Sequence, residues 1–254
     1  TRYFSVPVRL LRGLISGEKP IKEFTSDVVD YSLYYHAKHS LYGEKGEKGG
    51  YNSIETQMRA AGKFLHVKIG NIDTVIHNGE GLYNQYQKEN YCGINTNIIW
   101  DYKEHNKTDY QIALFCAFCA TRSIIGKSEY KKTNIKMIVA RMFGYNNYSE
   151  MVADTPNITA KNVNKRIIES RKKEIAEREK YLTRYHYDKI LSDLEIKWGL
   201  KRYSDHTRGM LISYILDYGK LAEINESSKK IVQIVRLKEL KEQARIKAKQ
   251  KYSK

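Results

Sequence analysis

The chain has 254 residues, of which 41% are hydrophobic and 29% charged, so it can bury a core and lies outside the composition range of disordered proteins. Its formal net charge of +16 favours a polyanionic partner. Three cysteines give no disulfide framework, and no apolar run approaches the roughly 20 residues of a membrane span. We therefore expect a cytoplasmic protein with no membrane partner, bound metal or cofactor.

The positive charge is concentrated in the second half of the chain. Residues 1–106 carry 13 basic and 12 acidic side chains, residues 107–226 carry 22 and 15, and residues 227–254 carry 10 and 2. An AT-rich genome would also enrich lysine, but that bias would act along the whole chain. We therefore predict a near-neutral N-terminal domain (1–106), a basic domain (107–226) and a basic tail (227–254).

The first domain is expected to be a helix-turn-helix unit with a β extension. Pro7 favours an edge strand, and Asn52 with Glu55 resembles a capping box that opens a helix. Gly70 and Asn71 predict a turn before the next helix. The expected elements are an edge strand at 3–11, helices at 26–41, 52–66 and 75–86, a strand at 93–102 and a flexible loop at 43–50.

The second domain is expected to surround one buried helix. Thr108 and Gln111 form an S/T-x-x-Q capping box before a segment that is apolar on almost all sides. Thr133 is expected to cap a short helix that ends at Gly144. The expected elements are helices at 108–125, 133–144, 159–180 and 183–199, a loop at 145–156, and a β-hairpin formed by 200–203 and 210–216.

The tail is expected to be a basic helix with a thin apolar seam. Its cations suit phosphate contact without sequence preference. A disordered or weakly helical solubilising end and a coiled-coil partner are the alternatives. The seam consists of Ile231, Ile234, Leu237, Leu240 and Ala244.

The order of elements in the second domain resembles a winged helix, in which the helix before the hairpin enters the major groove. A small α+β domain that only packs is the alternative. The segment of roughly forty residues between Gly144 and Thr183 departs from a tight helix-turn-helix, so it is either an insertion, or the helix that starts at Thr159 reads the DNA.

The candidate nucleic-acid-binding residues are basic and aromatic side chains in three places. The helix that Thr183 opens is expected to end at Gly199 and to carry an apolar stripe of Tyr187, Ile190, Leu191, Leu194 and Trp198. Its solvent-facing candidates are Arg184, Tyr185, His186 and Lys189. At or near the hairpin tip, they are Arg202, His206 and Arg208. In the helix that starts at Thr159, they are Lys161, Lys165, Arg166, Arg171, Lys172 and Lys173, although a solvated face with i,i+4 ion pairs would also explain these.

Several short patterns resemble metal-binding or catalytic motifs but lack residues that those motifs require. Cys116-x-x-Cys119 lacks further zinc ligands and lies in an apolar segment, so buried structural cysteines are expected. His36 and His39 could share a helix face, but no acidic pair completes a metal site. Gly126-Lys127-Ser128 lacks the first glycine of a P-loop, and a tyrosine recombinase would need an arginine where Gly209 stands. We therefore expect a protein that binds nucleic acid and does not catalyse a covalent reaction.

The chain as far as about Ala222 resembles the tandem winged-helix replication initiators of plasmids and mobile elements. The resemblance is architectural and includes the fragments MRAAGKFLHVKIGNIDTVIHNGEGLYNQY and TRYHYDKILSDLEIKWGLKRY. It implies that the first domain serves dimerisation and that the second reads repeated sites in double-stranded DNA. The alternatives are a transcriptional regulator, an RNA-binding or ribonucleoprotein component that uses some of the 21 tyrosines for stacking, and a structural protein of a mobile element.

Overall fold

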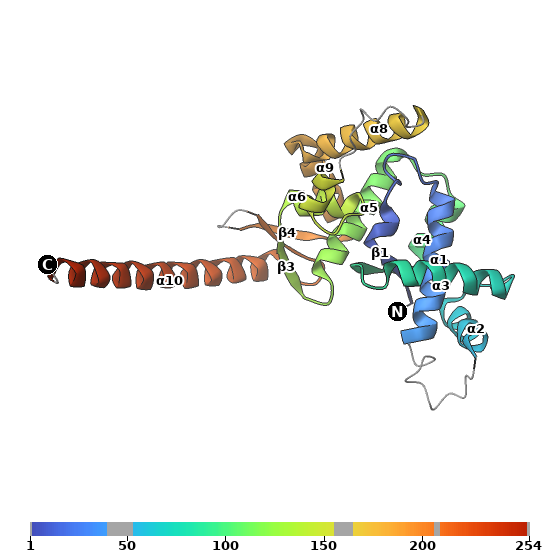
Figure 1. The fold of residues 1–254 in the computed structure, drawn as a ribbon, viewed down its shortest axis with the longest axis horizontal. Helices are drawn as coiled ribbons and strands as arrows, with labels where there is room; N and C mark the ends of the chain where they lie inside the picture. Colours follow the sequence, from blue (N-terminus) through green and yellow to red (C-terminus); the bar gives the residue numbers. More distant parts are fainter. Residues whose placement is uncertain (1, 40–52, 155–164, 206–208, 253–254) are drawn as a thin grey trace.

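The protein is mainly helical with small antiparallel sheets, which places it in the α+β class (Figure 1). The computed structural model describes residues 2–39, 53–154, 165–205 and 209–252. The predicted loop at 43–50 lies outside these ranges. So do Asn52, Thr159, Lys161, His206 and Arg208.

The first half of the chain packs three helices around α1 and a two-stranded sheet. Its elements are β1 (Tyr3–Pro7), the 3-10 helix η1 (Val8–Leu11), α1 (Ile21–His39), α2 (Ile54–Leu65), α3 (Ile72–Tyr86), β2 (Tyr91–Asn95) and α4 (Thr96–Glu104). β1 and β2 are antiparallel, with Tyr3 opposite Asn95 and Pro7 opposite Tyr91. The edge strand is confirmed for Tyr3–Pro7, whereas Val8–Leu11 form a 3-10 helix instead. The three predicted helices are confirmed, although the first begins at Ile21 and the third at Ile72.

Two local predictions in this half are wrong. The expected strand at 93–102 ends at Asn95, because the side-chain oxygen of Asn95 accepts a hydrogen bond from the N–H of Asn97 at 2.9 Å and caps α4. Helix α4 then buries Ile99 and Tyr102, which lie three positions apart. The cap of α2 is Ser53, whose hydroxyl accepts from the N–H of Thr56 at 3.2 Å.

The second half is built around α5, as predicted. Its elements are α5 (Asp109–Ile125), β3 (Tyr130–Thr133), α6 (Ile135–Met142), α7 (Tyr148–Ala153), α8 (Lys165–Leu182), α9 (Arg184–Trp198), β4 (Lys201–Ser204), β5 (Met210–Ser213) and α10 (Tyr218–Tyr252). The Thr108–Gln111 capping box is present, with reciprocal bonds of 3.3 and 2.9 Å. Every residue of 113–121 is buried, which confirms a central helix.

The predicted hairpin belongs to a three-stranded sheet, because β3 joins it. The strand order is β3-β5-β4, with Thr133 opposite Met210 on one side and Ser204 opposite Met210 on the other. Since Thr133 is part of a strand, the cap of α6 is Asn134, whose side chain accepts from the N–H of Met137 at 3.0 Å. The predicted Thr133 cap is therefore wrong.

The prediction of a loop at 145–156 is wrong for Tyr148–Ala153, which form the helix α7. The side chain of Asn147 accepts from the N–H of Glu150 at 2.8 Å and opens this helix. Gly144 ends the preceding turn with φ +82°, where a Cβ would lie 2.8 Å from the backbone nitrogen of Arg12. Glycine is therefore required there for both conformation and space.

The buried apolar residues of both halves form one cluster, which includes Phe4, Val28, Phe115, Leu191 and Ile212. Helix α5 contacts β2 and η1 of the first half as well as α6 and α9 of the second half. The division of the chain at 106 stays a prediction.

Helix α10 extends away from the rest of the protein as a single rod (Figure 1). It has 35 residues and thus a length of roughly 52 Å. It begins at Tyr218, before the predicted tail, and every residue of 229–243 is exposed. The predicted apolar seam therefore faces solvent from Ile231 to Leu240, where Ile231 is 62% and Leu237 58% exposed.

Candidate nucleic-acid interface

Helix α9 is fixed on one face and exposed on the other. Ile190, Leu191 and Leu194 are almost fully buried in the common core, which confirms the predicted apolar stripe. Gly199 ends the helix with φ +74° and leads directly into β4. On the outer face Tyr185 is 72% exposed. The sheet and the core therefore hold α9 with its N-terminal turns toward solvent.

The four predicted residues of α9 lie together on its first two turns. The Arg184 side chain is 90% exposed and its Nε lies 3.6 Å from an oxygen of Asp188. Lys189 is exposed and its Nζ lies 4.9 Å from the ring centre of Tyr110. His186 is half-buried, and its Nδ1 lies 2.9 Å from the hydroxyl of Thr183. Arg184, Tyr185 and Lys189 are thus accessible, whereas His186 is partly enclosed.

Arg202 has a structural role that its position near a hairpin tip does not suggest. Its guanidinium donates to Glu195 at 3.0 Å and to Asp188 at 3.3 Å, so it joins β4 to α9. Both carboxylates lie on the outer part of α9 and offset its positive charge. The predicted contact of Arg202 with nucleic acid stays a prediction, and its guanidinium is already engaged by two acids.

The end of the hairpin is held against β3. His206 and Arg208 lie outside the described residues, but the residues beside them are placed. The N–H of Asp205 donates to the carbonyl of Gly209 at 3.1 Å, and the Nζ of Lys132 lies 3.1 Å from a carboxylate oxygen of Asp205. Gly209 has φ +127°, where a Cβ would lie 2.7 Å from the carbonyl oxygen of Thr133.

The predicted cations of α8 are only partly placed. Arg171, Lys172 and Lys173 are exposed. Lys165 and Arg166 lie on the helix, but their side chains are outside the described part of the protein, as is the whole of Lys161. The expected solvated face is correct for the surface pair of Glu177 and Lys180, which are 2.9 Å apart.

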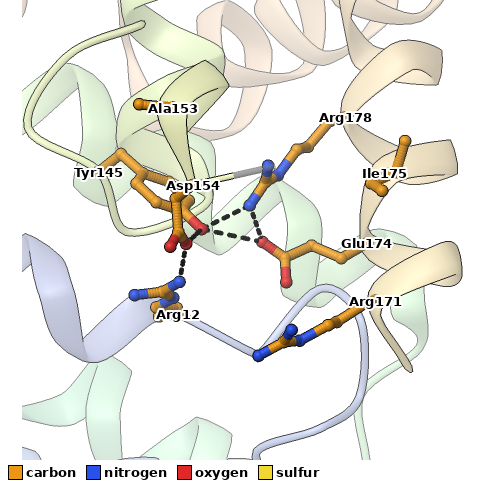
Figure 2. Close-up of a pocket in the computed structure, with 8 residues that line it drawn as sticks. All are labelled: Arg12, Tyr145, Ala153, Asp154, Arg171, Glu174, Ile175 and Arg178. Carbon is orange, nitrogen blue, oxygen red and sulfur yellow. Dashed lines mark hydrogen bonds and ion pairs between the residues drawn. The ribbon is translucent and has the colours of Figure 1, made fainter. Parts of the chain in front are cut away.

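The expectation of a solvated ion pair is wrong for Glu174 and Arg178 of α8, because their ion pair (Figure 2) is buried. Arg178 is 6% exposed and also donates to the hydroxyl of Tyr145. That hydroxyl donates to Asp154 at 2.6 Å, and Asp154 forms an ion pair with Arg12. Burial and the carboxylate of Glu174 raise the pKa of Tyr145 above its ordinary value.

This network anchors α8, and with it the start of α9. Arg178 also donates to the carbonyl of Met151 at 3.2 Å, so α8 is tied to α7 as well as to the segment after η1. The guanidinium of Arg178 lies 4.8 Å from the ring centre of Tyr145, and that of Arg12 lies 4.9 Å from it. Only Thr183 separates α8 from α9, so fixing α8 fixes where α9 begins.

A second polar cluster joins the two halves of the chain. Arg9, in η1, forms ion pairs with Glu89 and with Glu150 of α7. Burial acts to raise the pKa of Glu150, but the N–H of Asn146 and the guanidinium of Arg9 outweigh it, so this pKa lies below its ordinary value. The glutamate is therefore ionised where it helps to hold α7.

Sequence reasoning missed exposed lysines in and beside the sheet. Lys131 and Lys132 are exposed on β3, and Lys127 is exposed in the loop before it. The consecutive lysines at 131–132 were a possible signal, but no apolar pattern marked this segment as a strand. β3 therefore adds positive charge to the edge of the sheet.

The three cysteines are all buried. Cys92, Cys116 and Cys119 are buried free thiols, and burial raises the pKa of Cys116 and of Cys119. Among the residues that the structure describes, no three His, Cys, Asp or Glu side chains are grouped so as to hold a metal ion. In the same ranges no helix has the length and apolar character needed to cross a membrane.

Comparisons of the chain with protein-family models, with curated proteins and with solved structures gave no significant match.

Proposed function

We propose that this protein binds double-stranded DNA through a winged-helix unit that presents α9, with α10 as an additional cationic contact. The observation that carries the proposal is the order α5-β3-α6-α7-α8-α9-β4-β5, which matches a winged helix when α7 and α8 are set aside, together with the strand order β3-β5-β4. In a winged helix, a strand between the first two helices pairs with the hairpin that follows the reading helix. Helix α9 occupies the place of the reading helix in that order.

The accessible side chains of α9 are suited to a groove. Arg184 and Lys189 supply cations for phosphates or base edges, and Tyr185 supplies an exposed ring. Ile196 is 80% exposed on the same helix and offers an apolar contact for a thymine methyl group. The acids Asp188 and Glu195 are partly neutralised by Arg202.

We assign the reading role to α9 and treat α7 and α8 as an insertion. Helix α7 carries no lysine or arginine in its sequence, YSEMVA. Helix α8 uses Glu174 and Arg178 to pack on Tyr145, which turns that face of the helix inward. The exposed Lys172 and Lys173 remain available for phosphates beside the main contact.

Replication initiation at repeated sites of a plasmid or mobile element is the specific role that we propose, with the near-neutral first half serving dimerisation. The charge difference between the two halves supports this division of labour. A transcriptional regulator is the alternative within the same class. Selection of bound duplexes from a random pool distinguishes the two, because an initiator selects direct repeats and a dimeric regulator selects single palindromes.

The first test is the salt dependence of duplex binding by the full chain, followed by fluorescence anisotropy. If about six phosphates are engaged, the affinity falls roughly a thousandfold between about 50 and about 200 mM salt. Binding that does not change with salt, or no binding at physiological salt, refutes the proposal. Tighter binding of a single-stranded RNA of equal length would instead favour the RNA-binding alternative.

A pair of matched variants tests the assignment of α9. Lys189→Ala removes a predicted contact, and Lys63→Ala removes another exposed lysine, from α2 in the first half. We expect Lys189→Ala to weaken binding of all duplexes and to lower the salt slope by about one unit, while Lys63→Ala leaves both unchanged. Equal effects of the two variants would contradict the assignment.

A further inference from the structure

A cavity of about 740 Å³ lies between the β1–β2 sheet, the C-terminal end of α5 and the loop that follows it. Pockets for small ligands have volumes of roughly 300–1,000 Å³. The run 89–93 lines this cavity without a gap. Because side chains alternate between the two faces of a strand, an unbroken run indicates that the edge of β2 borders the cavity.

The cavity carries an excess of positive charge. Arg2, Arg122 and Lys127 line it, and none of them has an ion-pair partner among the residues that the structure describes. Glu89 is the acid in the lining, and its carboxylate is bound by Arg9 and by the side-chain amide of Asn146. Three unneutralised cations therefore face a cavity whose one carboxylate is already paired.

Two other polar hydrogens at the cavity are used within the protein. The hydroxyl of Ser123 donates to the carbonyl of Ala120 at 2.8 Å, and the thiol of Cys92 lies 3.8 Å from the carbonyl of Val6. The three cations are the charged donors in the lining, which favours a ligand with an anionic group such as phosphate.

Aromatic rings border the same cavity. Tyr3 is 39% and Tyr91 40% exposed, although both belong to the small sheet. Phe118 lines the cavity as well and stacks on Trp198, with ring centres 4.0 Å apart. Exposed tyrosine rings beside cations are the usual arrangement for stacking nucleobases while binding their phosphates.

We propose that this cavity binds a nucleotide, with its phosphate held by the cations and its base stacked on Tyr3 or Tyr91. A free mononucleotide and an unpaired nucleotide of a single strand share this chemistry. An acidic peptide would use the cations without the rings, and a neutral ligand would leave the cations unused. The inference is independent of the α9 interface, because neither Arg184 nor Lys189 lines this cavity.

The test uses the full chain and a fluorescein-labelled single strand of about five nucleotides, with unlabelled adenosine and thymidine monophosphates and inorganic phosphate as competitors. The variants are Lys127→Glu and Tyr91→Ala, because both side chains are exposed and line the cavity. The matched controls are Lys63→Glu on α2 and Tyr91→Phe, which keeps the ring.

We expect Lys127→Glu and Tyr91→Ala each to weaken binding by roughly tenfold, and the two controls to change it by less than about twofold. Displacement by the monophosphates identifies a free nucleotide as a ligand. Binding of the single strand alone, with the same dependence on the variants, identifies an unpaired strand. Both results support a nucleotide site.

Three results would overturn the inference. These are equal binding by Lys127→Glu and the wild type, equal binding by Tyr91→Ala and Tyr91→Phe, or inorganic phosphate competing as well as the monophosphates, which would indicate an anion site without base recognition. Duplex binding by the same variants separates this proposal from the α9 interface. Lys127→Glu should weaken single-strand binding much more than duplex binding, whereas Lys189→Ala should do the reverse.

Discussion

Replacing Arg178 with methionine removes the cation from the buried network while keeping a side chain of similar length. Glu174 and the hydroxyl of Tyr145 then lose their donor, and Glu174 is only 7% exposed. Breaking a buried ion pair by removing one partner costs about 3–5 kcal/mol, because a charge stays buried without compensation. We therefore expect the free energy of unfolding to fall by about 3–5 kcal/mol.

The measurement is urea denaturation of the full chain, followed by circular dichroism. With an m-value of about 3 kcal/mol/M, this loss lowers the urea midpoint by roughly 1–1.7 M. Glu177→Ala on the same helix is the matched control, because it breaks the partly exposed pair with Lys180. That pair contributes only about 0.2–1 kcal/mol.

The double variant Glu174→Leu/Arg178→Met shows whether the loss comes from the stranded charge. An apolar pair of similar volume in place of a buried ion pair is often neutral or stabilising, so the double variant should regain much of the lost stability. If Arg178→Met costs no more than Glu177→Ala, the network does not anchor α8. If the double variant is less stable than Arg178→Met, the explanation through an uncompensated charge is wrong.

Three further predictions concern the turn at Gly144, the ion pair of Glu150 with Arg9, and the basic tail. Gly144→Ala should lower the free energy of unfolding by more than about 1 kcal/mol in urea denaturation, because its φ is positive and a Cβ would meet the backbone of Arg12; an unchanged midpoint would contradict this. The pKa of Glu150 is depressed on folding, so its contribution is complete above its ordinary pKa of 4.5 and is lost as the pH falls through the lower folded value. Stability measured from pH 5 downward should therefore fall less steeply in Glu150→Gln than in the wild type, and parallel curves would refute the assignment. Deleting residues 228–254 removes 10 basic and 2 acidic side chains, so the salt slope of duplex binding should become shallower, whereas an unchanged slope would show that the tail makes no phosphate contact.

Signals contained within a few residues predicted structure well. The Thr108–Gln111 capping box, the apolar stripe of α9 and the stop at Gly199 are all present. Each depends on contacts between residues at most one or two helical turns apart, or on a single backbone conformation. The charge distribution along the chain is likewise a property of the sequence itself.

One failure came from pairing between distant segments, whereas the missed helix caps Ser53, Asn95 and Asn147 are local. β3 has the sequence YKKT, in which only Thr133 is buried, and its partner β5 follows about 80 residues later. The expected strand at 93–102 contains Ile98 and Ile99, which favour a strand locally, but the Asn95 cap and packing on the core select a helix. The strand propensity of residues 98–99 therefore did not decide the structure there, and β3 could not be recognised without its partner.

The sequence alone determined the apolar face of α9, the nearly neutral first half and the strongly basic end, because these follow from the order and chemistry of neighbouring residues. Only the tertiary structure decided that Arg202 is engaged by Asp188 and Glu195 and that Arg178 is buried on Tyr145. The same holds for the cavity that β1, β2 and α5 enclose together. Whether a cation is free for a partner depends on which acids the fold brings within a few ångströms, and those acids can lie anywhere along the chain.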